Sequence, residues 1–223
     1  MRDYAWLLEY ALNRCGSRAA LEARLPQPVD AATLKAQGDD RYLSLLTRRI
    51  FRAGLKHSLV DAKWPAFEEV FFGFDPDKVV LMGGERLERL MQDARLIRHL
   101  GKLRSVPLNA QMVLDFQRSH GSFGQLLAEW PGQDIVGLWE LLSKRGNQLG
   151  GLSAQRFLRM AGKDTFLATD DVVTALKAQN ILDKAPTAKR DRQKMQEAFN
   201  LWQEQSGRPL CQLSVMLALT VNH

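Results

Sequence analysis

Apolar residues recur at helical spacing along most of the chain. Between Asp3 and Arg14 they stand at Trp6, Leu7, Tyr10 and Ala11, which lie on one face of a helix. No stretch of appreciable length alternates apolar and polar residues as a half-buried strand does. There is also no internal repeat and no low-complexity tract. The pattern therefore predicts an all-α fold.

The same spacing, together with capping residues and turn-forming residues, predicts the other helices. An aromatic stripe that includes Trp64 follows Ser58, and we expect Trp64 to be buried in the core. Beyond the first helix, helices are expected over residues 17–24, 39–55, 58–71, 106–116, 134–144, 153–161, 172–178, 194–205 and 209–221, with a short segment at 123–130.

Prolines and polar residues mark one boundary in the chain. The run Leu25-Pro26-Gln27-Pro28 ends a helix, and the polar residues up to Gly38 are expected to link it to the next lobe. We therefore expect two helical lobes. Residues 1–40 and 165–223 form the terminal lobe in this prediction, and residues 41–164 form the central lobe.

Composition indicates a soluble globular protein, because 45% of the 223 residues are hydrophobic and 25% are charged. This excludes disordered and fibrous classes. The formal net charge of +6 suits a polyanionic partner without requiring one. A basic face on the helix expected over residues 39–55 is predicted to be solvated; it consists of Arg48, Arg49, Arg52 and Lys56.

Cysteine usage and the termini bear on the compartment. Cys15 and Cys211 are far apart and belong to no C-x-x-C pair, which argues against a disulfide framework and suits a reducing cytoplasm. The first residues lack the basic-then-apolar build of a signal peptide. The longest apolar run, Leu213 to Val221, is too short to span a bilayer. We expect a cytoplasmic protein with no membrane segment.

The stretch from Gly146 to Val173 carries the candidate chemistry. A glycine-bearing turn leads into the helix expected over residues 153–161, and a connector then delivers Asp170 and Asp171 to the next helix. Backbone amides at a glycine turn and a helix N-terminus favour an anion such as phosphate. An ordinary turn followed by an ordinary helix cap would account for the same residues.

This order and spacing resembles the helix-hairpin-helix, glycine- and proline-rich loop and aspartate of one superfamily of DNA glycosylases. Ser153-Ala154 match the family's Thr-Ala at the second hairpin helix. Counted from there, the family's essential aspartate falls on Asp170, with Asp171 as the runner-up by one residue. Val173 and Leu176 match the apolar positions that follow.

Two departures accompany that match. Gln148 stands where the family usually has its first hairpin glycine, and no proline precedes it. Leu152 occupies the position of the lysine that attacks the sugar in bifunctional members, so no amine is available there to form an imine. The resemblance therefore implies a monofunctional enzyme without lyase activity.

Further landmarks resemble the 3-methyladenine DNA glycosylase I family, in its order and nearly its spacing, over roughly residues 40 to 180. The run from Asp93 to Leu103, with its Ile-Arg-His-x-Gly-Lys core, is the most specific of them. The others are Arg52-Ala53-Gly54-Leu55, Trp64-Pro65-Ala66-Phe67, Phe74-Asp75-Pro76-Asp77-Lys78-Val79, Lys144-Arg145-Gly146 and Phe157-Leu158-x-x-Ala161-Gly162.

The resemblance also shows where this chain differs from that family. The family reads its base with a glutamate and a tryptophan, and those positions correspond here to Arg49 and His57. A different base pocket is therefore implied, for which Arg49, Phe51 and His57 are the candidates. The family's zinc, held by two cysteines and two histidines, is not expected, because the spacings are unsuitable for Cys15, Cys211, His57, His99, His120 and His223.

The activity that the resemblance implies is hydrolysis of the N-glycosidic bond of a damaged, alkylated purine (3-methyladenine-like) during base excision repair. Breaking this bond builds positive charge on the deoxyribose, which a fixed carboxylate stabilises. Asp170 is the candidate for that role, and Asp171 is the alternative. No cofactor is implied, and the cleft expected between the two lobes would hold the base.

The implied partner is double-stranded DNA with a flipped damaged base, bound by a monomer. Extruding a base costs a few kcal/mol, so the strand needs a clamp. By analogy with the hairpin, the clamp is assigned to the amides of Leu149, Gly150, Gly151, Leu152 and Ser153, supported by Lys144, Arg145 and Lys163.

Two other hypotheses stay open at this point. The chain could be a non-catalytic helix-hairpin-helix DNA-binding protein that lost base excision, since Arg49 and His57 replace the family's base readers. It could also be an unrelated helical protein whose landmarks match by coincidence. Base release from damaged duplexes separates the first from an enzyme, and DNA binding at low salt excludes the second.

Overall fold

The computed structural model describes residues 1–221, and within that range the regular elements are helices with no strand, as the pattern predicted. The chain divides into two compact units. The first comprises residues 1–29, 131–139 and 162 onward, and the second comprises residues 30–130 and 140–161. No helix within residues 1–221 combines the length and apolar character needed to cross a membrane.

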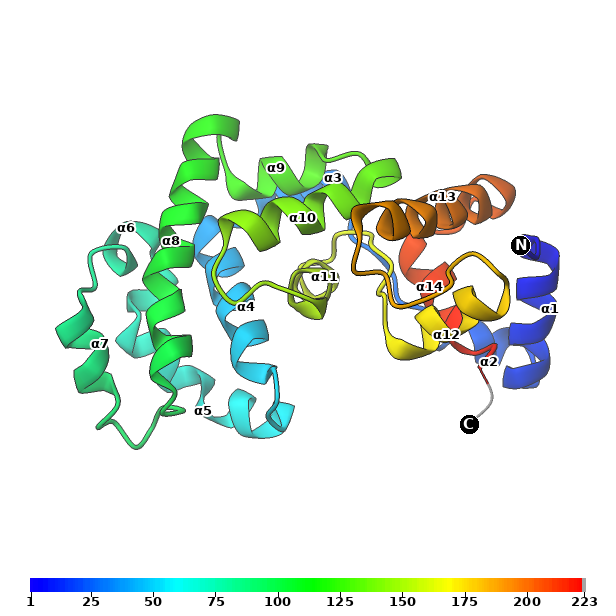
Figure 1. Ribbon diagram of the computed structural model, residues 1–223. Coiled ribbons are helices and arrows are strands. Elements are labelled where there is room, and N and C mark those ends of the chain that lie inside the picture. Colours follow the sequence, from blue (N-terminus) through cyan, green and yellow to red (C-terminus); the bar gives the residue numbers. More distant parts are fainter. Residues whose placement is uncertain (222–223) are drawn as a thin grey trace. The chain divides into compact units, whose positions relative to one another are not determined.

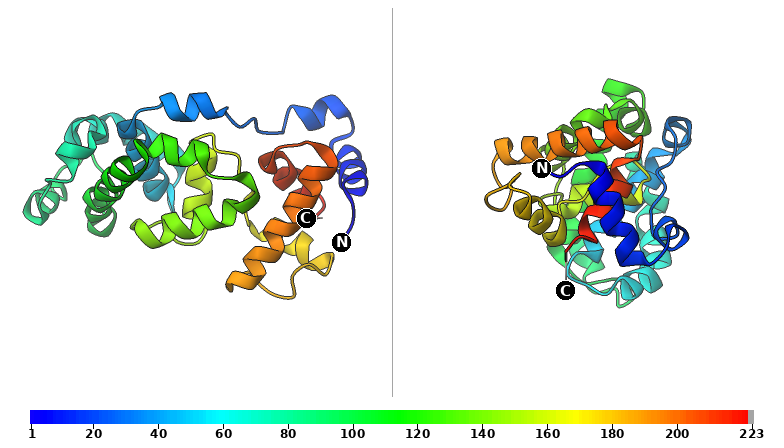
Figure 2. Two further views of the ribbon diagram at one scale, coloured as in Figure 1. Left: turned by 90° about the horizontal axis from the view of Figure 1, so that it is seen from above. Right: turned by 90° about the vertical axis from the view of Figure 1, so that its right-hand side faces the viewer.

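The first unit has a core of aromatic residues between helices from both ends of the chain. Phe166 stacks on Phe199 with ring centroids 4.1 Å apart, and Trp202 meets Phe199 edge-on. Helix α14 contacts α1, α12 and α13, as Figures 1 and 2 show. The elements are α1 (Tyr4–Cys15), α2 (Arg18–Glu22), η2 (Gly132–Asp134), α12 (Asp170–Ala178), α13 (Lys189–Ser206) and α14 (Leu210–Ala218).

The second unit is built around its longest helix, α8 (Leu100–His120), which packs against α4, α6, α7 and α9 (Figure 1). Trp64 is buried, as expected, with 6% of its surface exposed. The elements are α3 (Ala31–Ala36), α4 (Asp39–Arg52), α5 (His57–Val70), η1 (Phe72–Phe74), α6 (Pro76–Val79), α7 (Gly84–Leu90), α9 (Phe123–Glu129) and α11 (Leu152–Met160). Helix α10 (Ile135–Arg145) begins in the first unit and ends in the second.

The segment that was expected to be a polar link contains a helix. Asp30 caps α3 by accepting a hydrogen bond from the Thr33 amide at 2.7 Å. Helix α3 packs against α9, and the Tyr42 hydroxyl donates to the Leu34 carbonyl at 2.7 Å. These contacts place α3 with the second unit, so the unit begins at Asp30 rather than after residue 40. Such a short helix leaves little periodicity in the sequence.

The basic face of α4 is not uniformly solvated, which corrects the expectation. Arg48 and Arg52 both form ion pairs with Asp61 on α5, at 2.9 Å and 2.6 Å. Arg49 is buried, with 5% of its surface exposed. The periodicity placed all three side chains on the polar face, but α11 packs against α4 and covers part of it.

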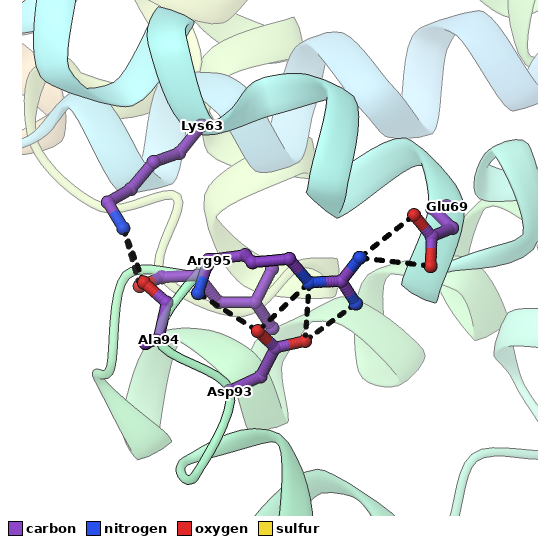
Figure 3. Close-up of polar contacts among 6 residues, drawn as sticks. Lys63, Glu69, Asp93, Ala94 and Arg95 are labelled. Atoms are coloured by element: carbon purple, nitrogen blue, oxygen red, sulfur yellow. Dashed lines mark hydrogen bonds and ion pairs between the residues drawn. The ribbon is translucent and has the colours of Figure 1, made fainter.

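The landmark run at residues 93–103 forms a polar network in the loop before α8 (Figure 3). The guanidinium of Arg95 donates to both carboxylate oxygens of Glu69, at 3.1 and 3.0 Å, and pairs with Asp93 at 2.8 Å. The Lys63 ammonium donates to the Ala94 carbonyl at 2.7 Å. These bonds fix the loop to α5.

The second half of the same run joins the loop to the end of α4. The His99 imidazole caps α8 by accepting a hydrogen bond at Nδ1 from the Lys102 amide at 3.2 Å. The Lys102 ammonium donates to the Ala53 carbonyl at 2.7 Å and the Phe51 carbonyl at 3.4 Å. The histidine and the lysine of the landmark therefore have structural roles, which the sequence alone did not reveal.

Candidate functional site

Helix α8 anchors the glycine turn between α10 and α11 from its buried side. Asn109 of α8 donates from Nδ2 to the Asn147 carbonyl at 3.0 Å, and its Oδ1 accepts from the Asn147 amide at 2.7 Å. A side chain at Gly146 would meet Leu149 at 2.5 Å and the Leu142 carbonyl at 2.8 Å. Glycine is therefore required at this position by close packing.

The turn contains two residues in the left-handed region of backbone conformation. Gln148 has a φ of +63° and Gly151 a φ of +56°. A glycine adopts such values without strain, whereas a glutamine does not. The backbone at Gln148 thus has a geometry that favours the glycine which the resemblance places there.

The start of α11 lacks a side-chain cap. Its N-cap residue is Gly151, and no side-chain cap hydrogen bond is formed there within residues 1–221. Gly150 and Gly151 are exposed, and a Cβ at either would meet nothing within 4 Å. The Ser153 amide donates to the Gly150 carbonyl at 3.1 Å, while Leu149 is buried beneath the turn. This open, uncapped helix start is suited to an anion.

The three candidate cations differ in their pairing. Lys144 is exposed at the last turn of α10 and forms no ion pair within residues 1–221. Arg145 pairs with Asp115 at 3.1 Å and lies over the Phe116 ring. Lys163 belongs to the first unit, only 8% of it is exposed, and burial lowers the pKa of its ammonium. Lys144 is thus the cation most available to a phosphate.

In the first unit, a connector at residues 162–169 leads to the candidate acid and is anchored to α14. The Asp164 carboxylate accepts hydrogen bonds from the amides of Leu210, at 2.9 Å, and Cys211, at 2.8 Å. It therefore caps the start of α14. The Ser214 hydroxyl accepts from the Leu167 amide at 3.0 Å. Sequence reasoning missed Asp164, because it lies 46 residues before Leu210, the first residue of the helix that it caps.

The connector is also anchored by buried side chains. The Trp139 indole donates to the Thr165 hydroxyl at 3.0 Å, and Thr165 and Phe166 are fully buried. Gly162 has a φ of +85°, and a side chain there would meet Val29 at 2.7 Å. The backbone that precedes the acid is therefore fixed over most of its length.

Asp170 is the first residue of α12, which was expected to begin just after Asp170 and Asp171 and which ends at Ala178, as predicted. The Thr169 hydroxyl caps the helix by accepting from the Val172 amide at 3.4 Å, so Asp170 is not needed as the cap. The Asp170 side chain is exposed and forms no hydrogen bond or ion pair within the described range. Asp171 is half-buried. Asp170 thus presents an unpaired carboxylate at a helix N-terminus.

The three base-pocket candidates lie in different environments. His57 is exposed at the first position of α5. The Phe51 ring is fully buried and meets Phe67 edge-on with centroids 4.7 Å apart. Arg49 is buried, and the Nε of its guanidinium has no hydrogen-bond partner in the part of the chain that the structure describes. Of the three, Arg49 is the buried polar group that lacks a partner.

The donors of a zinc site do not come together in the described residues. Within residues 1–221, no three His, Cys, Asp or Glu side chains form a group that could hold a metal ion. Cys15 is on α1 and Cys211 is buried on α14, and neither forms a disulfide within the described residues. His223 lies outside the described residues. The residues present do not fit the zinc site of the family.

The sequence matches one protein-family model, and it aligns with curated relatives over part of its length. The family model described as methyladenine glycosylase matches residues 33–147. DNA-3-methyladenine glycosylase 1 of Escherichia coli K12 is 39% identical over 72 residues, which are 32% of this chain and 38% of that protein. The chain therefore aligns with about two fifths of the length of the curated relatives it matches.

Solved structures show the same fold at low sequence identity. 3-Methyladenine DNA glycosylase I of Staphylococcus aureus, described for 3-methyladenine recognition, is 24% identical with a TM-score of 0.52. The match covers 68% of this chain and 91% of that one. The 8-oxoguanine glycosylase/lyase of Methanocaldococcus jannaschii, solved with a 15mer DNA containing 8-oxoguanine, is 14% identical with a TM-score of 0.55. That match covers 96% and 95% of the two chains.

These likenesses show that the chain shares the all-α fold of these DNA glycosylases. The family match extends over more than half of the 223 residues and includes the loop network before α8. The chain belongs to the methyladenine glycosylase family.

Proposed function

We propose that this protein is a cytoplasmic, monofunctional DNA glycosylase that hydrolyses the N-glycosidic bond of a damaged purine during base excision repair. Its relatives point to alkylated purines of the 3-methyladenine class. Family membership supports the reaction, and the unpaired carboxylate of Asp170 is the single observation that carries it. The proposed partner is double-stranded DNA with the damaged base flipped out, bound by one copy of the chain.

Asp170 is proposed as the catalytic carboxylate. The departing base leaves positive charge on the deoxyribose, and a carboxylate near C1′ stabilises that charge and orients water. Asp170 lies at the N-terminus of α12, which is the positive end of the helix dipole. Asp164 and Thr165 anchor the connector, so the carboxylate changes position little when substrate binds.

The hairpin is proposed to bind the DNA backbone. A phosphate at the start of α11 would accept hydrogen bonds from first-turn amides that no side chain occupies. Lys144 would add a cation, and the exposed glycines Gly150 and Gly151 allow close approach of the strand. These contacts are independent of base sequence, as a repair enzyme requires.

Strand cleavage is not part of the proposed reaction. The residue at the start of α11 is Leu152, whose side chain has no nucleophile that could attack the sugar. Water is then the remaining acceptor of the glycosyl group. The expected product is free base and an abasic site in an intact strand.

The test measures free base released from duplexes that carry 3-methyladenine, 7-methylguanine, ethenoadenine, hypoxanthine, 8-oxoguanine or uracil. We expect release from at least one damaged purine, and Asp170→Asn should reduce that rate about 100-fold or more while DNA affinity is kept. Asp171→Asn is the matched control, with a much smaller effect. Equal rates for wild type and Asp170→Asn would remove Asp170 from the mechanism.

A second candidate function is non-catalytic DNA binding through the same hairpin. It is favoured by the replacement of the family's base readers by Arg49 and His57. The same assay decides between the two. Tight, salt-sensitive binding to DNA with no base released from any of the duplexes would support the binding protein over the enzyme.

A further inference from the structure

Arg49 on α4 is a buried cation for which the described residues provide no hydrogen-bond or ion-pair partner. It is 5% exposed, its Nε has no hydrogen-bond partner, and no carboxylate pairs with it in the described range. Lys102, which is 9% exposed, differs because its ammonium donates to two backbone carbonyls. Buried charges in proteins are normally paired or hydrogen-bonded. Arg49 departs from that rule.

The charges near Arg49 are of the same sign. Burial, followed by the guanidiniums of Arg156 on α11 and Arg52 on α4, lowers the pKa of Arg49. Lys102 is also close, because Arg49 contributes to lowering the pKa of that lysine. Arginine nevertheless keeps its proton in proteins. The guanidinium of Arg49 therefore remains positive and lacks an acceptor that the described chain could supply.

The positive charge of Arg49 and its missing acceptor favour some classes of damaged base over others. A purine alkylated at N3 or N7 carries a positive charge while it is attached to deoxyribose, and an unneutralised guanidinium repels it. A neutral purine with a carbonyl oxygen offers an acceptor to the guanidinium donors, as guanine O6 does to arginine. Binding such a base would also satisfy the donors that folding leaves unsatisfied.

We propose that Arg49 is a specificity-determining residue that binds the carbonyl oxygen of a neutral oxopurine and disfavours cationic purines such as 3-methyladenine. This inference rests on the proposed function and narrows its substrate class from damaged purines to 6-oxo- and 8-oxopurines. A backbone phosphate is the other acceptor that could reach a guanidinium. The burial of Arg49 favours the base, because the exposed Lys144 is better placed for a phosphate.

Stability gives a first test that does not depend on activity. Arg49→Met removes an unpaired buried charge and keeps an apolar side chain, so the melting temperature is expected to rise. Arg52→Met, on the same helix, breaks the ion pair with Asp61 and is expected to lower it. A lower melting temperature for Arg49→Met would show that the guanidinium supports the fold, and would overturn the proposal.

The second test compares base release from duplexes with hypoxanthine or 8-oxoguanine against duplexes with 3-methyladenine. Wild type is expected to favour an oxopurine. Arg49→Met should reduce oxopurine release about 10- to 100-fold without reducing 3-methyladenine release. Arg49→Glu should raise 3-methyladenine release, and Arg156→Met is the control for a general loss of charge. Wild type favouring 3-methyladenine, with a ranking unchanged in Arg49→Met, would overturn the inference.

Two further measurements separate the possible failures. If Arg49→Met weakens binding to undamaged duplex as much as to lesion duplex, the acceptor is a phosphate and the inference is wrong.

If wild type releases no base at all, the proposed glycosylase activity fails. Titration of the full chain with free hypoxanthine, followed by NMR, then tests Arg49 alone: binding by wild type and weaker binding by Arg49→Met would support its role. No binding by wild type would overturn it.

Discussion

Two regions of the molecule begin a helix in opposite ways. In the first unit, Thr169 caps α12 and Asp164 caps α14, so side chains occupy the amides at both helix starts. In the second unit, Gly151 is the N-cap of α11 without a side-chain cap among the described residues, and Gly150 and Gly151 are exposed. Capping stabilises a helix, typically by about 1 kcal/mol. Its omission at α11 leaves hydrogen-bond donors open.

The difference matches the chemistry proposed for each region. A catalytic carboxylate must be held still, and the connector before Asp170 has its own polar groups satisfied by the protein. A backbone-binding turn must present unoccupied amides, and it is instead held from its buried side by Asn109. Both regions are thus held rigidly, but only in the first unit do side chains accept hydrogen bonds from the amides at the helix starts.

The largest expected effect tests the close packing of the turn. Gly146→Ala places a methyl group 2.8 Å from the Leu142 carbonyl, which cannot move cheaply, and should destabilise the protein by about 2 to 3 kcal/mol. Gly150→Ala, in open space, is the control and should change stability by less than about 0.5 kcal/mol. Denaturant unfolding measures both variants. Equal stability of the two would show that the turn is not held by packing.

The next effect tests the anchor of the connector. Asp164→Ala removes the acceptor of two backbone amides at the start of α14, and should destabilise the protein by about 2 kcal/mol. Base release should fall more than DNA affinity, because the loosened segment carries Asp170. Asp183→Ala, at an exposed position, serves as the control. A loss confined to DNA affinity would contradict the distinction between the two regions.

A smaller effect tests strain in the turn. Gln148→Gly removes a side chain from a residue with a φ of +63°, and should stabilise the protein by about 1 kcal/mol. Asn147→Gly, one residue earlier and outside the left-handed region, should not stabilise it. Thermal unfolding of the two variants checks the sign. Destabilisation by Gln148→Gly would mean that the glutamine side chain contributes contacts that outweigh the strain.

The smallest expected effect concerns pH and the buried Lys163 of the connector. Burial lowers the pKa of its ammonium from 10.5, so the unfolded chain binds this proton more tightly than the folded one. The free energy of unfolding therefore increases as the pH rises from the lowered pKa of the folded state towards 10.5. The difference in unfolding free energy between wild type and Lys163→Met, measured against pH, should show that rise. A difference independent of pH would contradict it.

Much of the helical architecture was accessible from the sequence because long amphipathic segments carry a clear period. Helix α12 was predicted to follow Asp170 and Asp171 and to end near Ala178, and it begins at Asp170 itself. The short elements α3, α6 and α7 were missed, since helices of four to seven residues hold too few turns to show a period. Helix α13 was expected from Lys194 but begins at Lys189, because its first turn is polar.

The sequence by itself determined the helical class and the order of the landmarks, and it singled out Asp170 as the proposed catalytic acid. The tertiary structure alone decided which polar groups are satisfied. Arg48, Arg49 and Arg52 are near neighbours on one helix, yet two of them pair with Asp61 and the third is buried without a partner. The physical reason is that pairing and burial depend on neighbouring helices, here α5 and α11, whose approach no local pattern encodes.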